Sequence, residues 1–300
     1  MSQHLRDAFQ QRLLELQSSI CKGLEAFEPE SRFVTDAWVR PEGGGGSSRV
    51  LESGQTFAKG GVNFSAVSGE LPDFLKREQA HSMADDRSAT FFATGLSLVI
   101  HPVSPRVPIV HMNIRYFETN SGVWWFGGGI DLTPIYIVEE DARAFHRGLK
   151  DVCDRHPVAD YAHYSKWAED YFTLPHRNET RGIGGIFFDR LKGDAQACLD
   201  FTLDVGEAFL PLYSPIVAKH RTSSYGEQEL AWQALRRGRY VEFNLVNDRG
   251  TRFGLETNGR TESILMSLPP LAQWRYNHLP EPGTPEAQTL FHLQNRTKWH

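Results

Sequence analysis

The sequence predicts an α+β protein built on one large, mainly antiparallel sheet of about seven strands, with helices covering both faces. Segments with strand character follow one another in consecutive runs, and segments with helical character are grouped outside those runs. A strict alternation of strands and helices would instead predict a doubly wound parallel sheet. The 300 residues are 40% hydrophobic and 23% charged, which suffices for the core of a single domain over 1–300.

The first predicted element is an N-terminal helix over 1–27. Its apolar residues, among them Phe9, Leu13 and Ile20, recur at helical spacing between charged residues. They form no continuous apolar stretch, so we expect no signal peptide. No run of about 18 apolar residues occurs, so no transmembrane segment is expected either. We therefore expect a cytoplasmic protein.

The middle of the chain has strand character. The stretch GGGGSS at 43–48 predicts a tight glycine-rich turn within the domain, because short strands separated by glycine turns follow it. From Phe91 onward come FFATGLSLVIH, VPIVHMNIRYFET and GVWWFGGGIDL. The prolines at 102, 105 and 108 separate the first two of these segments.

The C-terminal half is predicted to mix helices with further strands. Helical character covers 139–172, 194–216, 227–237 and 285–296, and GIGGIFFDRL predicts a short strand. RYVEFNLVNDRGTRFGLE predicts a hairpin around Asn247–Gly250, and TESILMSLP predicts a last strand. The strand-rich stretch 240–275 would leave an apolar sheet edge that another surface has to cover.

Charge and cysteine usage exclude several classes of protein. The formal net charge of -5 gives no general attraction to nucleic acid or to an anionic membrane. Cys21, Cys153 and Cys198 are far apart and form no CxxC pair, which is typical of free thiols in a reducing compartment. The sequence also lacks a phosphate-binding loop, a dinucleotide fingerprint, a nucleophile elbow and an HExxH pair.

Two of the predicted strands carry polar residues on one face. In VHMNIRYF, alternation places His111, Asn113 and Arg115 together, and in GLSLVIH it places Ser97 with His101. Such a face can simply be the solvated side of an antiparallel sheet. These residue types, however, suit recognition and proton transfer, and helices on both faces of the sheet would turn this surface into a cleft.

In the stretch WWFGGGIDLTP, a single carboxylate, Asp131, follows aromatic residues and glycines, and its role has to be explained. Three glycines before it permit close approach of another group to the backbone. Asp131 could cap the turn that follows, or it could be a carboxylate in an aromatic, partly dry site. In the second case it needs hydrogen-bond donors or a cation. A ligand that meets this need would bring donors at its centre and be largely apolar around them.

Arginines and histidines suggest two further features. Arg177, Arg181 and Arg260 lie in glycine-rich turns of an acidic protein, where they could form surface ion pairs or bind an anionic substrate. Several histidines could also meet at a divalent metal ion, although their spacing carries no ligand signature. The histidines in question are His101, His111, His146 and His176.

Five blocks in this order resemble the oxygen-dependent coproporphyrinogen-III oxidases of haem biosynthesis. The blocks span 40–275 and read GGGGSSRVLESGQTFAKGGVNFS, HPVSPRVPIVHMNIRYFET, WWFGGGIDLTP, HRNETRGIGGIFFDRL and YVEFNLVNDRGTRFGLETNGRTESILMSLPP. The resemblance implies a homodimer, for which the stretch 240–275 is the candidate contact. It also implies an enzyme that converts two propionates of coproporphyrinogen-III to vinyls, giving protoporphyrinogen-IX with use of O2 and release of CO2 and H2O2. It implies no obligatory cofactor, with a divalent metal (Mn or another) as a possibility in bacterial members.

The resemblance also assigns roles to individual residues. Asp131 would face the pyrrole N–H groups at the centre of the macrocycle, His111 would be the proton donor, and Arg115 completes the catalytic set. The implied substrate contacts are Ser97, Asn113, Ile114, Arg115, Asp131, Asn258, Gly259 and Arg260. The implied metal ligands are the four histidines named above. The chain departs from the family pattern at Ala58, Gly60 and Asn258, the last of which lies in the expected propionate-binding turn.

Two alternatives remain open on the sequence alone. One is a metal-dependent oxygenase or decarboxylase that uses the histidine cluster. The other is a tetrapyrrole-binding protein without turnover. A proton donor at His111 and a cation at Arg115 beside Asp131 favour the oxidase, because a carrier needs no proton donor there.

Overall fold

A seven-stranded antiparallel sheet forms the centre of the protein. The computed structural model describes residues 3–71, 90–256 and 259–300. The strands follow the order β1-β2-β3-β4-β5-β6-β9, and each neighbouring pair is antiparallel. Their bounds are β1 (Val34–Val39), β2 (Gly44–Glu52), β3 (Phe57–Glu70), β4 (Thr90–Pro102), β5 (Ile109–Thr119), β6 (Trp124–Thr133) and β9 (Gly184–Leu191).

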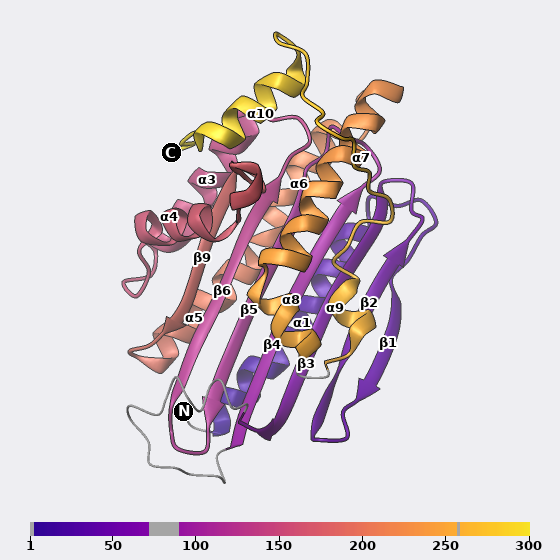
Figure 1. Ribbon diagram of the computed structural model, residues 1–300. Helices are drawn as coiled ribbons and strands as arrows, with labels where there is room; N and C mark the ends of the chain where they lie inside the picture. Colours follow the sequence, from indigo (N-terminus) through magenta and orange to yellow (C-terminus); the bar gives the residue numbers. More distant parts are fainter. Residues whose placement is uncertain (1–2, 72–89, 257–258) are drawn as a thin grey trace.

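Helices cover both faces of this sheet (Figure 1). A small second sheet pairs β7 (Thr173–Leu174) with β8 (Glu179–Thr180), around the turn η1 (Pro175–Arg177). The α-helices are α1 (Gln3–Glu25), α3 (Glu139–Asp154), α4 (Tyr161–Tyr171), α5 (Ala195–Glu207), α6 (Phe209–His220), α7 (Glu227–Glu242), α8 (Arg249–Glu256), α9 (Thr261–Leu265) and α10 (Pro285–Asn295). A π-helical turn, η2 (Phe243–Asn247), joins α7 to α8.

The back face of the sheet packs against α1, α3, α5 and α6 and holds the main core. Strand register aligns a row of apolar side chains across five strands, because residues in register share a face. Every member of this row is fully buried. The row consists of Val62, Leu98, Met112, Ile130 and Ile186.

The front face of the sheet is covered less evenly. A second apolar cluster joins α7, through Trp232, Leu235 and Tyr240, to Val99 and Ile109 of the sheet. A third and smaller cluster consists of Ala168, Phe172, Leu174 and Phe243, with Tyr171 and Phe187 packed beside it. Between these clusters lie the polar residues of β4, β5 and β6, so this face carries the site described below.

The α+β prediction is confirmed, but the predicted strands in 240–275 are wrong. This stretch is helical and comprises the end of α7, then η2, α8 and α9. Tyr240, Phe243 and Asn244 are buried at helical spacing, which the sequence analysis took for strand alternation. The predicted turn at Asn247–Gly250 starts a helix, since the Asp248 carboxylate accepts hydrogen bonds from the backbone N–H and hydroxyl of Thr251.

The glycine-rich stretch 43–48 differs from its prediction as well. The turn ends at Gly43, and β2 begins at Gly44, so most of these glycines lie in a strand. That strand pairs with β1, an edge strand that the sequence analysis did not predict. A Cβ on Gly46 would lie 2.5 Å from the Trp38 ring, so a glycine is required where this ring covers the strand. The sheet therefore has seven strands, as expected, but it includes β1, which was not predicted, and none of the strands predicted after residue 240.

The remaining predictions agree with the fold. The helices expected near 1–27, 139–172, 194–216, 227–237 and 285–296 are present within the described residues. All three cysteines are buried free thiols. Among the helices that the structure describes, none is both long and apolar enough to span a membrane.

Candidate active site

The polar face predicted for two strands exists and extends to a third. Ser97 of β4 lies opposite Asn113 of β5, and His111 of β5 lies opposite Asp131 of β6. These side chains share the front face because residues in register point the same way. Ser97, His111 and Asn113 are half-buried, whereas Asp131 is almost completely covered. The face is therefore a partly open surface with one carboxylate beneath it.

The glycines before Asp131 make room for an arginine. Gly127 lies opposite Arg115, and a Cβ on Gly127 would be 3.0 Å from the Arg115 guanidinium carbon. Arg115 donates hydrogen bonds to Asn113 Oδ1 (2.7 Å) and to Asp189 Oδ1 (2.9 Å). Its side chain remains 34% exposed, so the guanidinium faces the open part of the site. Any larger residue at position 127 would displace this cation.

Asp131 is held by two donors. Its Oδ1 accepts a hydrogen bond from His111 Nδ1 (2.8 Å), and Arg181 Nη2 donates to both Oδ1 (2.9 Å) and Oδ2 (2.8 Å). Asp131 is 1% exposed and the Arg181 side chain 2% exposed, so this is a buried ion pair. The sequence analysis expected either a turn cap or a carboxylate satisfied by donors, and the second description applies.

Arg181 occupies a cage of aromatic rings. Its guanidinium carbon lies 4.2 Å from the centre of the Phe172 ring, 4.7 Å from that of Tyr240 and 4.6 Å from that of Phe243. Such cation–π contacts stabilise a desolvated cation. The sequence analysis expected Arg181 either in a surface ion pair or bound to an anionic substrate, but its side chain is buried and pairs with Asp131. The neighbouring Gly182 was the available signal, because a Cβ there would meet the Leu132 carbonyl at 2.1 Å, next to Asp131.

These contacts set the charges in the site. Burial alone would raise the pKa of the Asp131 carboxyl, but the Arg181 guanidinium and the His111 ring lower it below its usual value. Asp131 is therefore ionised near neutral pH. An ionised carboxylate only accepts hydrogen bonds, so His111 Nδ1 carries a proton. In the neutral ring Nε2 is then the free base, and His111, at 21% exposed, can exchange a proton with a ligand.

A second carboxylate, Asp248, and a tyrosine, Tyr171, also lie near this face of the sheet. The Tyr171 hydroxyl donates to Asp248 Oδ1 (2.7 Å), and the Tyr171 ring stacks on Phe187 at 4.5 Å. Burial acts to raise the pKa of Asp248, but hydrogen bonds from Thr251 and Tyr171 lower it below its usual value. The sequence analysis missed Tyr171 and Asp248. Only the packing of 171–172 against 243–248 brings them beside His111.

The structure does not bring the four candidate metal-ligating histidines together. His101 Nε2 pairs with the Ser267 carbonyl (2.8 Å), and His176 Nε2 pairs with the Glu242 carboxylate (2.8 Å). Both ring nitrogens of His146 are hydrogen-bonded, to the Tyr161 hydroxyl and to the Ile183 carbonyl. Within the described residues, no three His, Cys, Asp or Glu side chains converge as a metal site requires. These residues do not fit a shared metal ion.

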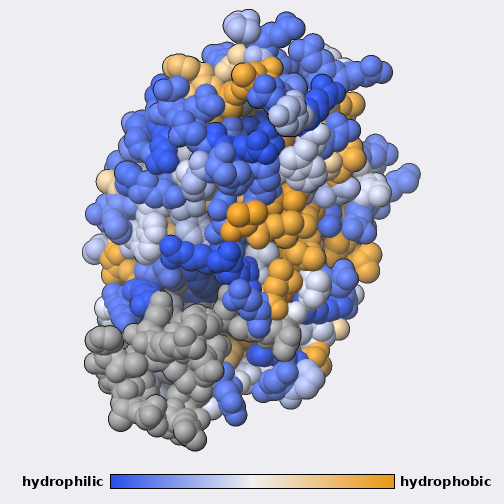
Figure 2. All heavy atoms as spheres, viewed as in Figure 1, coloured by the Kyte–Doolittle hydropathy of each residue, from blue (hydrophilic) through white to orange (hydrophobic). Residues whose placement is uncertain are grey.

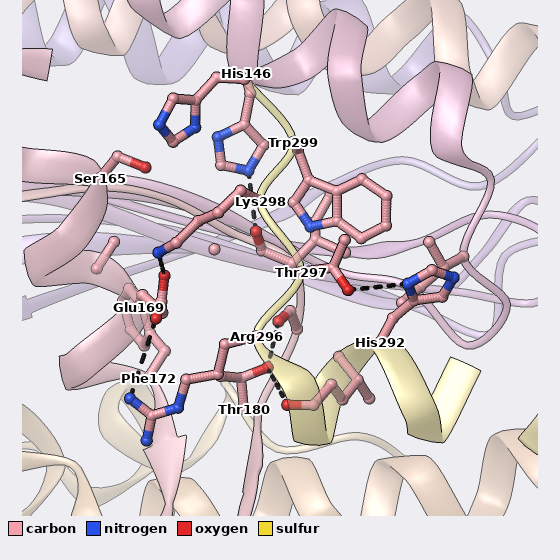
Figure 3. Close-up of a pocket in the computed structure, with 17 residues that line it drawn as sticks. His146, Ser165, Glu169, Phe172, Thr180, His292, Arg296, Thr297, Lys298 and Trp299 are labelled. Carbon is pink, nitrogen blue, oxygen red and sulfur yellow. Dashed lines mark hydrogen bonds and ion pairs between the residues drawn. The ribbon is translucent and has the colours of Figure 1, made fainter. Parts of the chain in front are cut away.

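Two of these histidines are buried and neutral. Burial lowers the pKa of His101 to about 3 and that of His146 to about 4. His146 lines a cavity of about 30 Å³ next to α10, large enough for one water molecule, together with His292 and Trp299 (Figure 3). This cavity is separate from the Asp131 site, and its volume is too small to hold a macrocyclic substrate.

The turn expected to bind propionates is anchored on the other side of the face. Arg260 forms an ion pair with Asp36 of β1, and the Gly259 N–H donates to the Gly254 carbonyl (2.8 Å). Just beyond, the Ser263 carbonyl accepts a hydrogen bond from Asn63 (2.7 Å), which fixes α9 to the sheet. Asn258 lies outside the described residues. The remaining candidate, Ile114, faces the back of the sheet, and the whole residue is buried.

The front face thus combines a buried carboxylate–arginine pair, a half-buried histidine and the partly exposed cation of Arg115, groups that can exchange a proton and bind an anion. Comparison with protein families matches residues 8–299 to the family described as coproporphyrinogen III oxidase. The chain belongs to that family. It is also 47% identical to an oxygen-dependent coproporphyrinogen-III oxidase of Drosophila melanogaster, over 99% of this chain and 79% of the fly protein.

Proposed function

We propose that this protein catalyses the oxygen-dependent oxidative decarboxylation of coproporphyrinogen III to protoporphyrinogen IX. Each reacting propionate, with one O2 and one proton, gives a vinyl group, CO2 and H2O2, so the two electrons lost by the substrate reduce the oxygen. Membership of the family supports this reaction. The observation that carries it is the buried Asp131–Arg181 pair beneath His111, because it keeps an ionised carboxylate hydrogen-bonded to a histidine that is itself partly exposed.

We place the macrocycle on the front face of β4, β5 and β6. Its propionates would meet Arg115 and the Gly259–Arg260 turn, and Ser97 and Asn113 would contact the ring. Bidentate guanidinium contacts suit carboxylates at such a rim. Asp131 is covered by His111, so direct contact with the pyrrole N–H groups requires the His111 ring to turn away. Without that movement, the charge of Asp131 acts on the substrate through His111.

Each of these residues then has a separate role in the reaction. An electron-rich porphyrinogen pyrrole can itself react with O2, so the protein mainly orients the substrate and places charge. The carboxylate of Asp131 stabilises positive charge on an oxidised pyrrole. The half-buried His111 would exchange, through Nε2, the proton that the reaction requires. Arg115 holds a propionate, and the rings around Arg181 keep water from the ion pair.

The test is a single-turnover experiment with metal-assayed, EDTA-treated protein. The protein is mixed with coproporphyrinogen III under anaerobic conditions, O2 is added, and products are analysed. Divinyl product with two CO2 per substrate, in protein free of metal, is the expected result. Turnover only after one particular divalent metal is restored would favour a metal-dependent oxygenase. Tight binding without any CO2 release would indicate a tetrapyrrole-binding protein and would overturn the proposal.

We further propose that the protein works as a homodimer through the surface of the described residues within 240–275. Figure 2 shows a hydrophobic patch near the middle of the front face, over the junction of α7, η2 and α8. Exposed apolar side chains of this kind, rimmed by polar residues, favour an interface. On and beside this surface the exposed members are Leu245, Val246, Leu255, Leu271, Trp274, Tyr276 and Leu279.

Sedimentation velocity tests the dimer. Leu271→Asp should convert a dimer to a monomer, because it buries a charge in the contact. Phe291→Asp, at a similarly exposed apolar side chain of α10, is the matched control and should leave the dimer intact. A wild-type protein that sediments as a monomer at micromolar concentration would refute the proposed assembly. The cytoplasmic location remains a prediction, which fractionation of cells expressing the chain would check.

A further inference from the structure

Glu242, the last residue of α7, is the most heavily hydrogen-bonded carboxylate near the site. Its side chain is 12% exposed. Its two oxygens accept five N–H groups from four residues, so neither oxygen is left for another partner. The donors are His176 Nε2 (2.8 Å), Arg177 Nε (2.8 Å) and Nη2 (2.7 Å), Arg239 Nη1 (2.9 Å) and Trp274 Nε1 (2.9 Å).

These donors come from three separate segments. His176 and Arg177 belong to η1, the turn between β7 and β8, and Arg239 lies one turn earlier in α7. Trp274 belongs to the segment after α9, which lies directly on α7. A Cβ on Gly238 would be 2.5 Å from the Gln273 carbonyl and 3.3 Å from the Trp274 ring. The Glu242 carboxylate therefore ties η1 and the 273–274 segment to the end of α7.

Two of these segments continue directly into residues that contact Arg181. On one side, Phe172 directly precedes β7 and Arg181 directly follows β8, and the Arg181 N–H donates to the Phe172 carbonyl (2.7 Å). On the other side, Phe243 directly follows Glu242, and the Asn244 side chain accepts from Arg181 Nη1 (3.5 Å). The aromatic cage of Arg181 thus has two walls, one formed by Phe172 and the other by Tyr240 and Phe243. Glu242 links them through its hydrogen bonds to η1.

We propose that Glu242 is a positioning residue for catalysis, which holds the two walls together so that Arg181 stays paired with Asp131. This inference rests on the proposed role of the Asp131–Arg181 pair. Replacement of the carboxylate by an amide keeps the shape but turns one acceptor into a donor. That donor faces the N–H groups of either His176 and Arg177 or Arg177, Arg239 and Trp274. The walls then separate, and Arg181 shifts relative to Asp131.

The test compares Glu242→Gln with a matched carboxylate far from the site. Glu28 is 5% exposed and accepts the backbone N–H groups of Gln55, Thr56 and Phe57. Both variants lose charge-assisted hydrogen bonds, so both should lower the melting temperature. At a temperature where circular dichroism shows all proteins folded, Glu242→Gln should lower kcat about tenfold with KM changed less than about threefold. Glu28→Gln should leave kcat within about twofold of wild type.

A double-mutant cycle shows whether the effect passes through Arg181. In an Arg181→Lys background, Glu242→Gln should lower kcat by no more than about twofold further, because the contact it supports is already altered. An equal factor in both backgrounds, or an unchanged kcat in Glu242→Gln, would overturn the inference alone. Wild-type kcat in Arg181→Lys would overturn both the proposed site and this inference.

A milder variant keeps the test decisive if Glu242→Gln does not fold. Arg177→Gln removes two of the five N–H donors at a side chain that is 40% exposed. It should lower kcat about threefold, and this loss should also disappear in the Arg181→Lys background. Full activity in Arg177→Gln would contradict the inference.

Discussion

The two faces of the central sheet use the same strands in opposite ways. On the back face, alternate residues of β3, β4, β5, β6 and β9 form one continuous apolar row with no exposed member. On the front face, the residues between them include His111, Asn113, Arg115 and Asp131, whose polar groups are paired with partners from several segments. Replacing a buried ion pair by apolar residues is often neutral or stabilising. The back face therefore stabilises the fold, and the front face keeps charges that folding alone does not need.

The largest expected effect comes from Asp131→Asn on the front face. It removes the charge beneath the substrate and leaves the buried Arg181 guanidinium unpaired. We expect kcat to fall at least about 100-fold and the free energy of unfolding to drop by about 3–5 kcal/mol. Product analysis by chromatography and urea unfolding measure the two quantities. Asp189→Asn, at a half-exposed carboxylate paired with Arg115, is the control and should lose far less stability. Full turnover by Asp131→Asn would remove this carboxylate from the mechanism.

On the back face, Leu98→Ala should change stability without changing chemistry. The cavity left by a fully buried leucine costs about 2–5 kcal/mol of unfolding free energy. The kcat per folded molecule should stay within about twofold of wild type, because no front-face group loses a contact. Val99→Ala, the next residue along β4, lies opposite His111 and should lower kcat as well as stability. If the leucine variant were the one with the slower turnover, the separation of roles between the faces would be wrong.

The buried neutral histidines should make stability fall in acid. The pKa of His101 is about 3 and that of His146 about 4 in the folded protein, against an ordinary value of 6.5. Below pH 6.5 the unfolded chain therefore binds protons that the folded protein does not, so stability is lost as the pH falls toward 4. At pH 5 the loss is about 2 kcal/mol per histidine relative to pH 7.

Urea midpoints between pH 8 and pH 5 check this prediction. His146→Gln should reduce the loss of stability below pH 6.5 and change the difference between pH 7 and pH 8 by less than about 0.3 kcal/mol, because the ring is mostly neutral in both states there. An acid slope as steep as that of wild type in this variant would show that His146 accepts a proton without unfolding.

The smallest expected change in stability is at the exposed edge of the front face. Arg260→Gln breaks a solvent-exposed ion pair with Asp36, which is worth less than about 1 kcal/mol. If Arg260 binds a propionate, KM should rise about tenfold with kcat within about twofold. Asp36→Asn breaks the same pair from the other side and should leave KM unchanged. A rise in KM in both variants would assign the effect to the ion pair instead of to substrate binding.

Much of this protein could be predicted from local patterns. The period-two alternation in β4 and β5 was enough to place Ser97, His111, Asn113 and Arg115 on one face, because strand geometry decides which way each side chain points. The same approach failed for 240–275. Apolar residues at short intervals there fit a strand or a helix, and only packing against Phe172 and Arg181 selects the helical form.

By itself, the sequence determined the class of fold, the faces of the central strands, the absence of paired cysteines and the blocks by which the family is identified. The tertiary structure alone decided which charges meet. Arg181 lies 50 residues from Asp131 and Glu242 lies 65 from Arg177, and no periodicity links residues so far apart. Their pairing depends on how β7, η1 and β8 pack against the end of α7. Burying an ion costs free energy unless a partner is placed there by the whole fold, so the ionic centre of the site is a property of the packing.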